Sequence, residues 1–441
     1  MANVERYENL IIGSGIAGKF LAWTGDAHRT AIVERGLLGG SCPNVACLPG
    51  KNMIWSAKVI SLARRGMEFG LKTESMAVDM GAVQRRKRTM VDELRRVHAD
   101  HTAASGAELI MGAARFVAPR TAEIELRDGG TRTIVGERVF LDLGSRAAIP
   151  EVPGLADAKP MTHVEVLDLD RLPKRLIVLG GGYVGLELSQ AFGRFGSAVT
   201  VIEEGPQLAS RGDSDIGAAL KNLFADEGIE VLLNARVRRV EGDSGDRVRI
   251  YVSDERGDRA IEGSDLLVAA GRKANSDGSG LDRAGVQLDP HGFIRVNERL
   301  ETTAENVWAM GDCAGSPQFT HVGYDDFSIV HANLNGANRT TRDRLIPFCM
   351  FTDPELARVG RNEVEARRDR IEYRLAKMPM AEVLRTKTIS EPRGLIKVLV
   401  AKNSDEILGF TAFGFEASEL MAAMQTACSA IYLTRFCATQ S

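Results

Sequence analysis

The segment Tyr7–Glu34, YENLIIGSGIAGKFLAWTGDAHRTAIVE, decides the fold. An apolar run leads into Gly13, Gly15 and Gly18 in the pattern GxGxxG, and a second apolar run, TAIVE, ends at Glu34. A strand, a glycine turn, a helix and a second strand in this order are the context in which GxGxxG holds a dinucleotide pyrophosphate. Glu34 follows Gly13 by 21 residues, where a carboxylate can bind a ribose hydroxyl. The alternative is an ordinary glycine-rich turn.

The same pattern returns near the middle of the chain. Gly180, Gly182 and Gly185 follow the apolar run RLIVL, and Glu203 lies 23 residues after Gly180. Two complete fingerprints predict two dinucleotide sites, each at a helix N-terminus. We therefore expect an α/β fold with two Rossmann-like domains. The helices should cover Ile16–Thr24 and Tyr183–Phe195, and strands Tyr7–Gly13, Thr30–Glu34, Arg175–Leu179 and Ala198–Glu203 should flank them.

Composition narrows the function classes. The 441 residues carry a formal net charge of −3 and only 6% aromatic residues, so nucleic acid is not an expected partner. No apolar run approaches the ~18 residues of a membrane span, and the N-terminus MANVERYENLIIG has charges where a signal peptide has its apolar core. We expect no membrane partner and a cytoplasmic location.

Further elements are expected along the chain. A long solvated helix is predicted over residues 76–106 and a small β-meander over 229–270. A proline-rich linker, with Pro150 and Pro153, suggests a boundary near 150. The last part of the chain should form an αβ unit with strands Ile346–Phe351, Tyr373–Pro379, Gly394–Val400 and Ile407–Phe413 and a helix Ala417–Leu433.

The segment GGSCPNVACLPGKN, residues 39–52, holds two cysteines five positions apart. In a reducing compartment such a pair is more often catalytic or metal-binding than structural. A regular helix would place the Cα atoms of Cys42 and Cys47 beyond the ~7 Å that a disulfide can bridge, so a disulfide requires a distorted first turn. Pro43 and Pro49 favour such a distortion. A metal pair or two core cysteines remain alternatives, although zinc would need further ligands and we predict no metal site.

At these residues the sequence resembles the class I pyridine nucleotide–disulfide oxidoreductases, which include lipoamide dehydrogenase, glutathione reductase and mercuric reductase. Their hallmark GGTCxNxGCxPxK compares with GGSCPNVACLPGK here. GGGYVGLE (180–187), VWAMGDCAG (307–315) and FTDPELARVG (351–360) resemble the family's second nucleotide turn, its FAD-clasping segment and the start of its dimerisation domain. The resemblance implies an FAD domain over 1–150 completed by 272–342, an NAD(P) domain over 151–271, and an interface domain over 343–441.

The resemblance also implies roles for single residues. Cys47 matches the thiolate that lies against the flavin, and Cys42 matches the cysteine that attacks the substrate. Lys51 matches the lysine near flavin N5, Glu187 matches its ion-pair partner, and Tyr183 matches the side chain that covers the flavin. The matching FAD contacts are Gly13, Gly15, Gly18, Glu34, Ser41, Ala114, Gly144, Ser145, Asp312 and Thr320. The matching nicotinamide-nucleotide contacts are Gly180, Gly182, Gly185, Glu203, Val237 and Gly271.

Taken together, these matches predict a homodimeric flavoenzyme that passes electrons from NADH through FAD to a Cys42–Cys47 disulfide and then to an external disulfide. NAD is favoured over NADP because Glu203 would repel a 2′-phosphate and no basic residue follows before Arg211. One alternative is reduction of a metal ion, a quinone or oxygen on the same scaffold. Another is an FAD-binding, redox-sensing protein without turnover.

The sequence departs from the family pattern at its end. The family carries an HPxxxE segment whose histidine is the acid/base for thiol–disulfide exchange, whereas no histidine follows His331 here. We therefore expect a truncated interface domain and impaired disulfide turnover. The other four cysteines are expected to be small core residues, namely Cys313, Cys349, Cys428 and Cys437.

Overall fold

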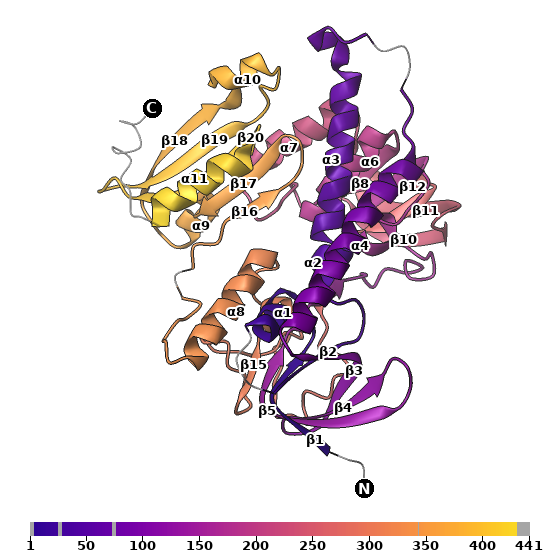
Figure 1. Cartoon of the computed structure of the whole chain (residues 1–441). Coiled ribbons are helices and arrows are strands. Elements are labelled where there is room, and N and C mark those ends of the chain that lie inside the picture. Colours follow the sequence, from indigo (N-terminus) through magenta and orange to yellow (C-terminus); the bar gives the residue numbers. More distant parts are fainter. Residues whose placement is uncertain (1–3, 25–28, 73–75, 343, 430–441) are drawn as a thin grey trace. The chain divides into compact units, whose positions relative to one another are not determined.

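The computed structural model describes residues 4–24, 29–72, 76–342 and 344–429. It divides into two compact units (Figure 1). The first unit comprises Met1–Gly50, Arg85–Ala147 and Arg272–Arg344, and the second comprises Lys51–Gln84, Ala148–Gly271 and Leu345–Ser441. The division into four domains remains a prediction, whereas the mixed α/β class is confirmed.

The first unit is built on a six-stranded sheet. Its central strand β1 (Val4–Ile12) pairs in parallel with both β2 (Thr30–Glu34) and β5 (Thr131–Leu141). Leu10 and Ile11, which face opposite sides of the sheet, are both fully buried, as expected for a strand covered on two faces. The sheet is completed by β3 (Glu108–Ala118), β4 (Thr121–Leu126) and β15 (Val307–Ala309), and β6 (Ser145–Ala147) pairs separately with β14 (Arg272–Ala274).

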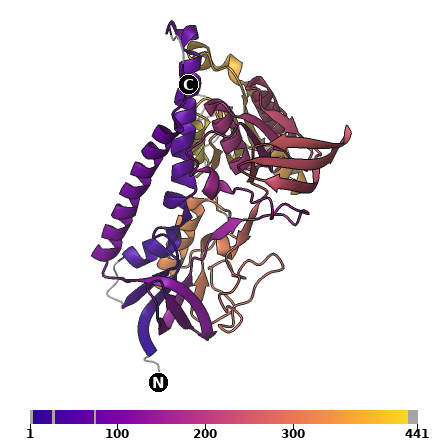
Figure 2. The same ribbon diagram turned by 90° about the vertical axis from the view of Figure 1, so that its right-hand side faces the viewer.

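Two helices cover one face of this sheet (Figures 1 and 2). They are α1 (Ile16–Trp23) and α8 (Thr320–Leu334). The ring of Phe20 in α1 lies 5.0 Å from Tyr324 and 5.7 Å from Phe327 of α8, measured between ring centroids. This aromatic contact holds the helix that follows the first glycine turn against the rest of the unit.

The second unit contains the second Rossmann sheet, in the order β13-β7-β8-β9. These parallel strands are Asp265–Val268, Arg175–Leu179, Ala198–Ile202 and Glu230–Leu232, with helices α6 (Tyr183–Phe195) and α7 (Ser214–Asp226). The expected meander over 229–270 is therefore wrong at both ends. Only β10 (Arg236–Asp243), β11 (Arg247–Asp254) and β12 (Gly257–Gly263) form it, because β13 is buried on both faces and joins the parallel sheet.

The last part of the second unit is a five-stranded antiparallel sheet in the order β16-β17-β20-β19-β18. The strands are Phe348–Met350, Glu355–Gly360, Ile407–Gly414, Leu395–Ala401 and Tyr373–Pro379, and α11 (Ala417–Ser429) packs on β17 and β20. The sequence did not predict β17. It lies in the segment FTDPELARVG, where only the resemblance to a dimerisation domain was noticed.

Of the remaining helices, the sequence predicted the long one over residues 76–106 and the start of the one at the cysteine pair. The long helix α4 spans Met80–Ala104, and α3 spans Cys47–Arg64. The short helices are α2 (Ser41–Asn44), α5 (His163–Val166), α9 (Glu363–Arg368) and α10 (Leu384–Thr388), and three single 3₁₀ turns cover Gly66–Phe69, Gly311–Ala314 and Met380–Glu382. Across the described ranges, none of the helices has the length and hydropathy needed to cross a membrane.

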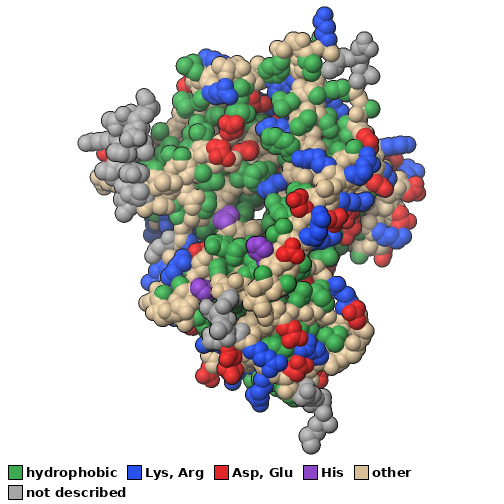
Figure 3. Space-filling view, in the orientation of Figure 1, with side chains coloured by type: hydrophobic (Ala, Val, Ile, Leu, Met, Phe, Trp, Pro, Cys, Tyr) green, Lys and Arg blue, Asp and Glu red, His purple; other side chains and the backbone are tan. Residues whose placement is uncertain are grey.

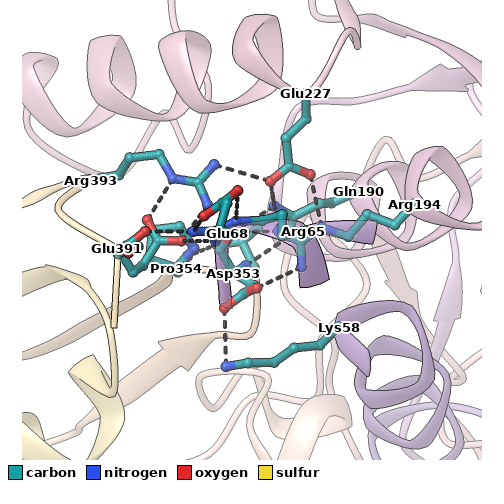
Figure 4. A network of polar contacts seen from close by, with 12 residues as sticks. Lys58, Arg65, Glu68, Gln190, Arg194, Glu227, Asp353, Pro354, Glu391 and Arg393 are labelled. Carbon is teal, nitrogen blue, oxygen red and sulfur yellow. Dashed lines mark hydrogen bonds and ion pairs between the residues drawn. The ribbon is translucent and has the colours of Figure 1, made fainter. Parts of the chain in front are cut away.

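A buried network of charges ties the segments of the second unit together (Figure 4). Arg194 of α6 is 7% exposed and contacts Glu227 and Asp353, each at 2.6 Å. Asp353 also binds Lys58 of α3 at 3.1 Å, and Glu227 binds Arg393 at 3.2 Å. Arg194, Asp353 and Glu227 each have two partners of opposite charge, so no charge in the network depends on a single contact. The network therefore fixes α3 and the last sheet to the second Rossmann fold.

Candidate active site

The first glycine turn leaves no room for side chains. Gly13, which follows β1, has a φ of 97°, and a Cβ there would collide with the carbonyl oxygen of Asp142. A Cβ at Gly15 would lie 2.5 Å from the Asp142 carboxylate, and one at Gly18 would collide with the carbonyl of Gly13. Glycine is therefore required at all three positions: at Gly13 for the backbone conformation and for space, and at Gly15 and Gly18 for space.

Glu34 braces this turn from the end of β2. Its Oε2 accepts hydrogen bonds from the Ser14 N–H at 3.0 Å and the Ser14 hydroxyl at 2.6 Å. Its Oε1 accepts from the Gly36 N–H at 2.6 Å. The acid predicted from the sequence to bind a ribose thus also holds the glycine turn in shape.

Asp142, at the end of β5, belongs to the same turn and was missed by the sequence analysis. Its Oδ2 accepts the Gly18 N–H at 2.8 Å. Complete burial raises the pKa of this carboxyl to about 7. The signal in the sequence was an acid directly after a buried strand, in FLDLGS, but no local pattern shows that β5 runs beside β1.

The second glycine turn repeats this geometry with one difference. A Cβ at Gly180 would lie 2.5 Å from the carbonyl of Ala269, whereas a Cβ at Gly182 would meet no atom within 4 Å. Glu203 Oε2 accepts from the Gly181 N–H and Oε1 from the Gly205 N–H, both at 2.7 Å. The N-terminus of α6 is therefore open at Gly182.

The other predicted FAD contacts lie in the first unit. Ser145 donates a hydrogen bond to Asp312, and Arg272 Nε donates to the Ser145 hydroxyl at 2.8 Å. Gly144 has a φ of 64°, and its carbonyl accepts from the Asn275 N–H at 3.1 Å. Ala114 lies on β3, and Ser41 is exposed at the first residue of α2.

The helix between the two cysteines is broken, as a disulfide would require. α2 ends at Asn44, Val45 has φ −142° and ψ 5°, and α3 begins at Cys47. A hydrogen bond with the Cys47 side chain, together with burial, raises the pKa of the Cys42 thiol. The hydroxyl of Thr320, the first residue of α8, lies 3.4 Å from Cys47 Sγ. The two sulfurs are therefore neighbours although a regular helix would separate them.

Lys51 and Glu187 both contact Phe351 in the second unit. Lys51 Nζ lies 4.1 Å from the centroid of the Phe351 ring, and Glu187 Oε1 accepts the Phe351 N–H at 2.7 Å. Cys349 lies beside both, and burial, Glu355 and Glu187 raise the pKa of its thiol while Lys51 opposes the shift. The two side chains predicted to form an ion pair thus share one neighbourhood.

Tyr183, the first residue of α6, stacks on Phe348 with ring centroids 5.5 Å apart, and burial raises the pKa of its hydroxyl to about 12. Val237 lies on β10, and Gly271 is exposed directly before β14. These positions carry the predicted nicotinamide-nucleotide contacts, whose roles remain predictions. Gly185 packs against the carbonyl of Gly180.

The remaining cysteines fit the expectation in part. Cys313 is fully buried, whereas Cys349 and Cys428 are half-buried, and Cys437 lies outside the described residues. Within the part of the chain that the structure describes, no three His, Cys, Asp or Glu side chains converge as a metal site would require.

The chain matches two family models over nearly its whole length. Residues 7–326 match the pyridine nucleotide-disulphide oxidoreductase family, and residues 346–434 match the dimerisation domain of the same family. The chain belongs to the pyridine nucleotide-disulphide oxidoreductases. This confirms the resemblance seen in the sequence, and it makes the protein an enzyme of the FAD-dependent, pyridine nucleotide-linked class.

Similar members of the family include mercuric reductases and the protein RclA. A mercuric reductase of Streptomyces lividans is 33% identical over 430 residues, which are 96% of this chain and 90% of that protein. The probable pyridine nucleotide-disulfide oxidoreductase RclA of Escherichia coli is 31% identical over 426 residues, 95% of this chain and 91% of RclA.

Solved structures agree with the fold. The Cu(II) complex of the HOCl-induced flavoprotein disulfide reductase RclA from Escherichia coli superposes with a TM-score of 0.86 at 30% identity, over 97% of this chain and 93% of that one. LpdA from Mycobacterium tuberculosis has the same fold, with a TM-score of 0.87 at 24% identity.

The residues present fit the cofactors that the family implies. Gly13, Gly15 and Gly18 form a turn that any Cβ would fill, and helix α1 begins directly beyond it. Gly182 leaves the N-terminus of α6 open, as a second pyrophosphate requires. Each unit therefore offers one dinucleotide cradle.

Proposed function

We propose that this enzyme transfers electrons from NADH, through FAD, to a disulfide between Cys42 and Cys47, and from there to an external disulfide. The observation that carries the proposal is the break between α2 and α3, which brings the Cys42 and Cys47 side chains into hydrogen-bond contact. Bound FAD would accept hydride from NADH and pass two electrons to the disulfide.

The two cysteines then have separate tasks. Once reduced, Cys42 attacks one sulfur of the external disulfide, forms a mixed disulfide and releases the first thiol. Cys47 next attacks the Cys42 sulfur, restores the Cys42–Cys47 disulfide and releases the second thiol. The two released thiols take up two protons, so the electrons of one NADH reduce one disulfide. The contact between the two side chains supports this division, because Cys47 lies within reach of a mixed disulfide formed on Cys42.

Glu203 supports NADH as the donor. Both of its oxygens already accept backbone N–H groups of the turn, which fixes the carboxylate at the end of β8. A carboxylate in this position can accept the ribose hydroxyls of NADH and repels the 2′-phosphate of NADPH.

A homodimer is proposed from the surface of the second unit. Helix α3 exposes Trp55, Val59 and Leu62, at 57%, 51% and 45%, on one helical face. Hydrophobic side chains are exposed on the surface of this unit in Figure 3, and its C-terminal sheet matches a dimerisation domain. Apolar stripes of this kind mark protein contact surfaces. The cytoplasmic location stays a prediction from the sequence.

Reduction of a metal ion is a second candidate, because curated relatives at 33% and 34% identity are mercuric reductases. The same scaffold could instead serve quinones or oxygen, or act as a redox sensor without turnover. Turnover with NADH against lipoamide, glutathione disulfide, Hg(II) and a quinone separates these acceptors.

The decisive experiment uses the visible spectrum of the FAD-loaded enzyme. Anaerobic NADH should produce a long-wavelength band from the Cys47 thiolate beside the flavin. Cys47→Ser should abolish the band, whereas Cys42→Ser should show it without any reductant, because Cys47 can then no longer form the disulfide. Cys428→Ser serves as the matched control, since this half-buried thiol lies in α11, outside the segments that match cofactor contacts. Unchanged spectra in both variants would refute the redox role of the pair.

A further inference from the structure

Lys19 is a buried cation close to the segment that holds Cys42 and Cys47. None of the proposed electron-transfer and thiol-exchange steps involves it. It lies in α1 directly after Gly18 and is 4% exposed. Its Nζ lies 3.5 Å from the carbonyl oxygen of Gly39, three residues before Cys42. A lysine this deeply buried is rare unless its charge is compensated.

The ammonium group is held by His98 of α4. Lys19 Nζ lies 2.8 Å from His98 Nε2, and His98 is 9% exposed. The His98 ring stacks on Trp23, with centroids 5.5 Å apart, and also lies against Gly39. Burial and the charge of Lys19, with a smaller effect of His101, lower the pKa of His98, while the carbonyl of Leu94 opposes the shift. A lowered pKa favours the neutral imidazole of His98, whose Nε2 can accept a hydrogen bond from the Lys19 ammonium group.

The charge of Lys19 is not balanced by a carboxylate in contact. Within the described residues, Lys19 forms no ion pair with an aspartate or a glutamate, and its polar contacts are His98 and the Gly39 carbonyl. Burial lowers the pKa of Lys19, and Cys42, followed by Asp142, opposes that shift. Lys19 Nζ also lies 5.6 Å from the centroid of the Trp23 ring, and a Cys42 thiolate would stabilise the ammonium charge further.

The interaction is reciprocal. The hydrogen bond with Cys47 and burial raise the pKa of Cys42, whereas Thr320 and the charge of Lys19 lower it. An ammonium in a low-dielectric site interacts more strongly with a nearby thiolate than a solvated one does. Cys42 and Lys19 therefore each stabilise the charged form of the other.

We propose that Lys19, held by His98, is the positioning residue whose charge stabilises the Cys42 thiolate for attack on the acceptor. This inference rests on the proposed function of Cys42 as the attacking sulfur. Helix α1 would then have two roles. It begins at the first glycine turn, and it also places the Lys19 ammonium group close to the segment that holds Cys42.

The test follows alkylation of Cys42 by iodoacetamide, quantified on the Cys42 peptide by mass spectrometry, from pH 5 to pH 10. The FAD-loaded enzyme is first reduced with dithiothreitol and desalted, so the measurement does not depend on NADH. Lys19→Met should raise the apparent pKa of Cys42 by about one unit, which is about tenfold slower alkylation at pH 7. Lys19→Arg, which keeps the charge, should stay within about threefold of the unchanged enzyme.

Two further variants make the result specific. His98→Phe keeps a ring against Trp23 but removes the acceptor of Lys19, and should shift the Cys42 profile in the same direction by less. Arg96→Met removes an exposed positive charge from the same helix, where it binds only a backbone carbonyl, and should leave the profile unchanged. Should Lys19→Met fail to retain FAD, the His98→Phe profile decides.

An unchanged Cys42 profile in Lys19→Met, or an equal shift in Lys19→Arg, would overturn the proposal. Weaker FAD retention with an unchanged Cys42 profile would also overturn it, because Lys19 would then serve the pyrophosphate instead. Failure of NADH to reduce the flavin of the unchanged enzyme would refute the proposed function but not the effect of Lys19 on Cys42.

Discussion

The two glycine turns share their sequence pattern and differ in what surrounds them. In both, a glutamate at the end of the second strand accepts two backbone N–H groups: Glu34 from Ser14 and Gly36, and Glu203 from Gly181 and Gly205. Only the first turn has a buried carboxyl behind it. This is Asp142, which binds the Gly18 N–H.

The space around the middle glycine also differs between the two fingerprints. At Gly15 a Cβ would lie 2.5 Å from the Asp142 carboxylate, whereas at Gly182 it would meet nothing within 4 Å. Gly15 is half-buried, whereas Gly182 is exposed. A closed turn suits a cofactor that stays bound, and an open turn suits a nucleotide that enters and leaves at each turnover. The same six-residue pattern thus stands in two different surroundings.

The largest expected effect tests this contrast directly. Gly15→Ala should lose most of its FAD, because the new methyl collides with the Asp142 carboxylate and overpacking a filled site typically costs about 1–3 kcal/mol. Gly182→Ala is the matched control: it should fold and retain FAD, with only a higher KM for NADH. Flavin absorbance per protein measures both. Equal FAD retention in the two variants would show that the turns do not differ.

An effect of intermediate size is expected on the nucleotide preference of the second turn. Glu203→Ala should narrow the preference for NADH over NADPH by about tenfold, which corresponds to ~1.4 kcal/mol, because the carboxylate that repels the 2′-phosphate is gone. The measurement is kcat/KM for dye reduction with each nucleotide. Equal efficiency of the unchanged enzyme with NADH and NADPH would contradict the assignment.

The smallest expected effect is a pH dependence specific to the first turn. Asp142 has a pKa of about 7 in the folded protein, above its ordinary value of 3.8. Between these values the folded state binds more protons than the unfolded state, so the free energy of unfolding falls as pH rises through this window. Asp142→Asn keeps an acceptor for Gly18 and should remove that slope.

Thermal unfolding of the FAD-loaded protein at pH 5, 6, 7 and 8 measures the slope. The change in melting temperature between pH 5 and pH 8 should be a few degrees smaller in Asp142→Asn than in the unchanged protein. The same slope in both proteins would show that Asp142 is already ionised at pH 5. Glu34→Gln provides a comparison at a neighbouring acid of the same turn.

Sequence patterns predicted the elements best where local chemistry fixes them. β2, β7 and α6 have the expected bounds, because each begins or ends beside a glycine or an acid of the fingerprint. The prediction failed for residues 229–270, whose first and last strands belong to another sheet. Alternation of apolar and charged residues identifies a strand, but it does not show which strands become neighbours.

The sequence by itself determined the family, the two glycine turns and the requirement for a distorted helix between Cys42 and Cys47. These follow from short-range rules: glycine where a Cβ would collide, proline where a helix must break, and an acid at a fixed distance from a turn. Only the tertiary structure decided what lies behind each site. Asp142 and His98 reach Gly18 and Lys19 from segments 124 and 79 residues away. No local pattern encodes such contacts, because chain folding alone sets which buried polar groups meet and how strongly burial changes their protonation.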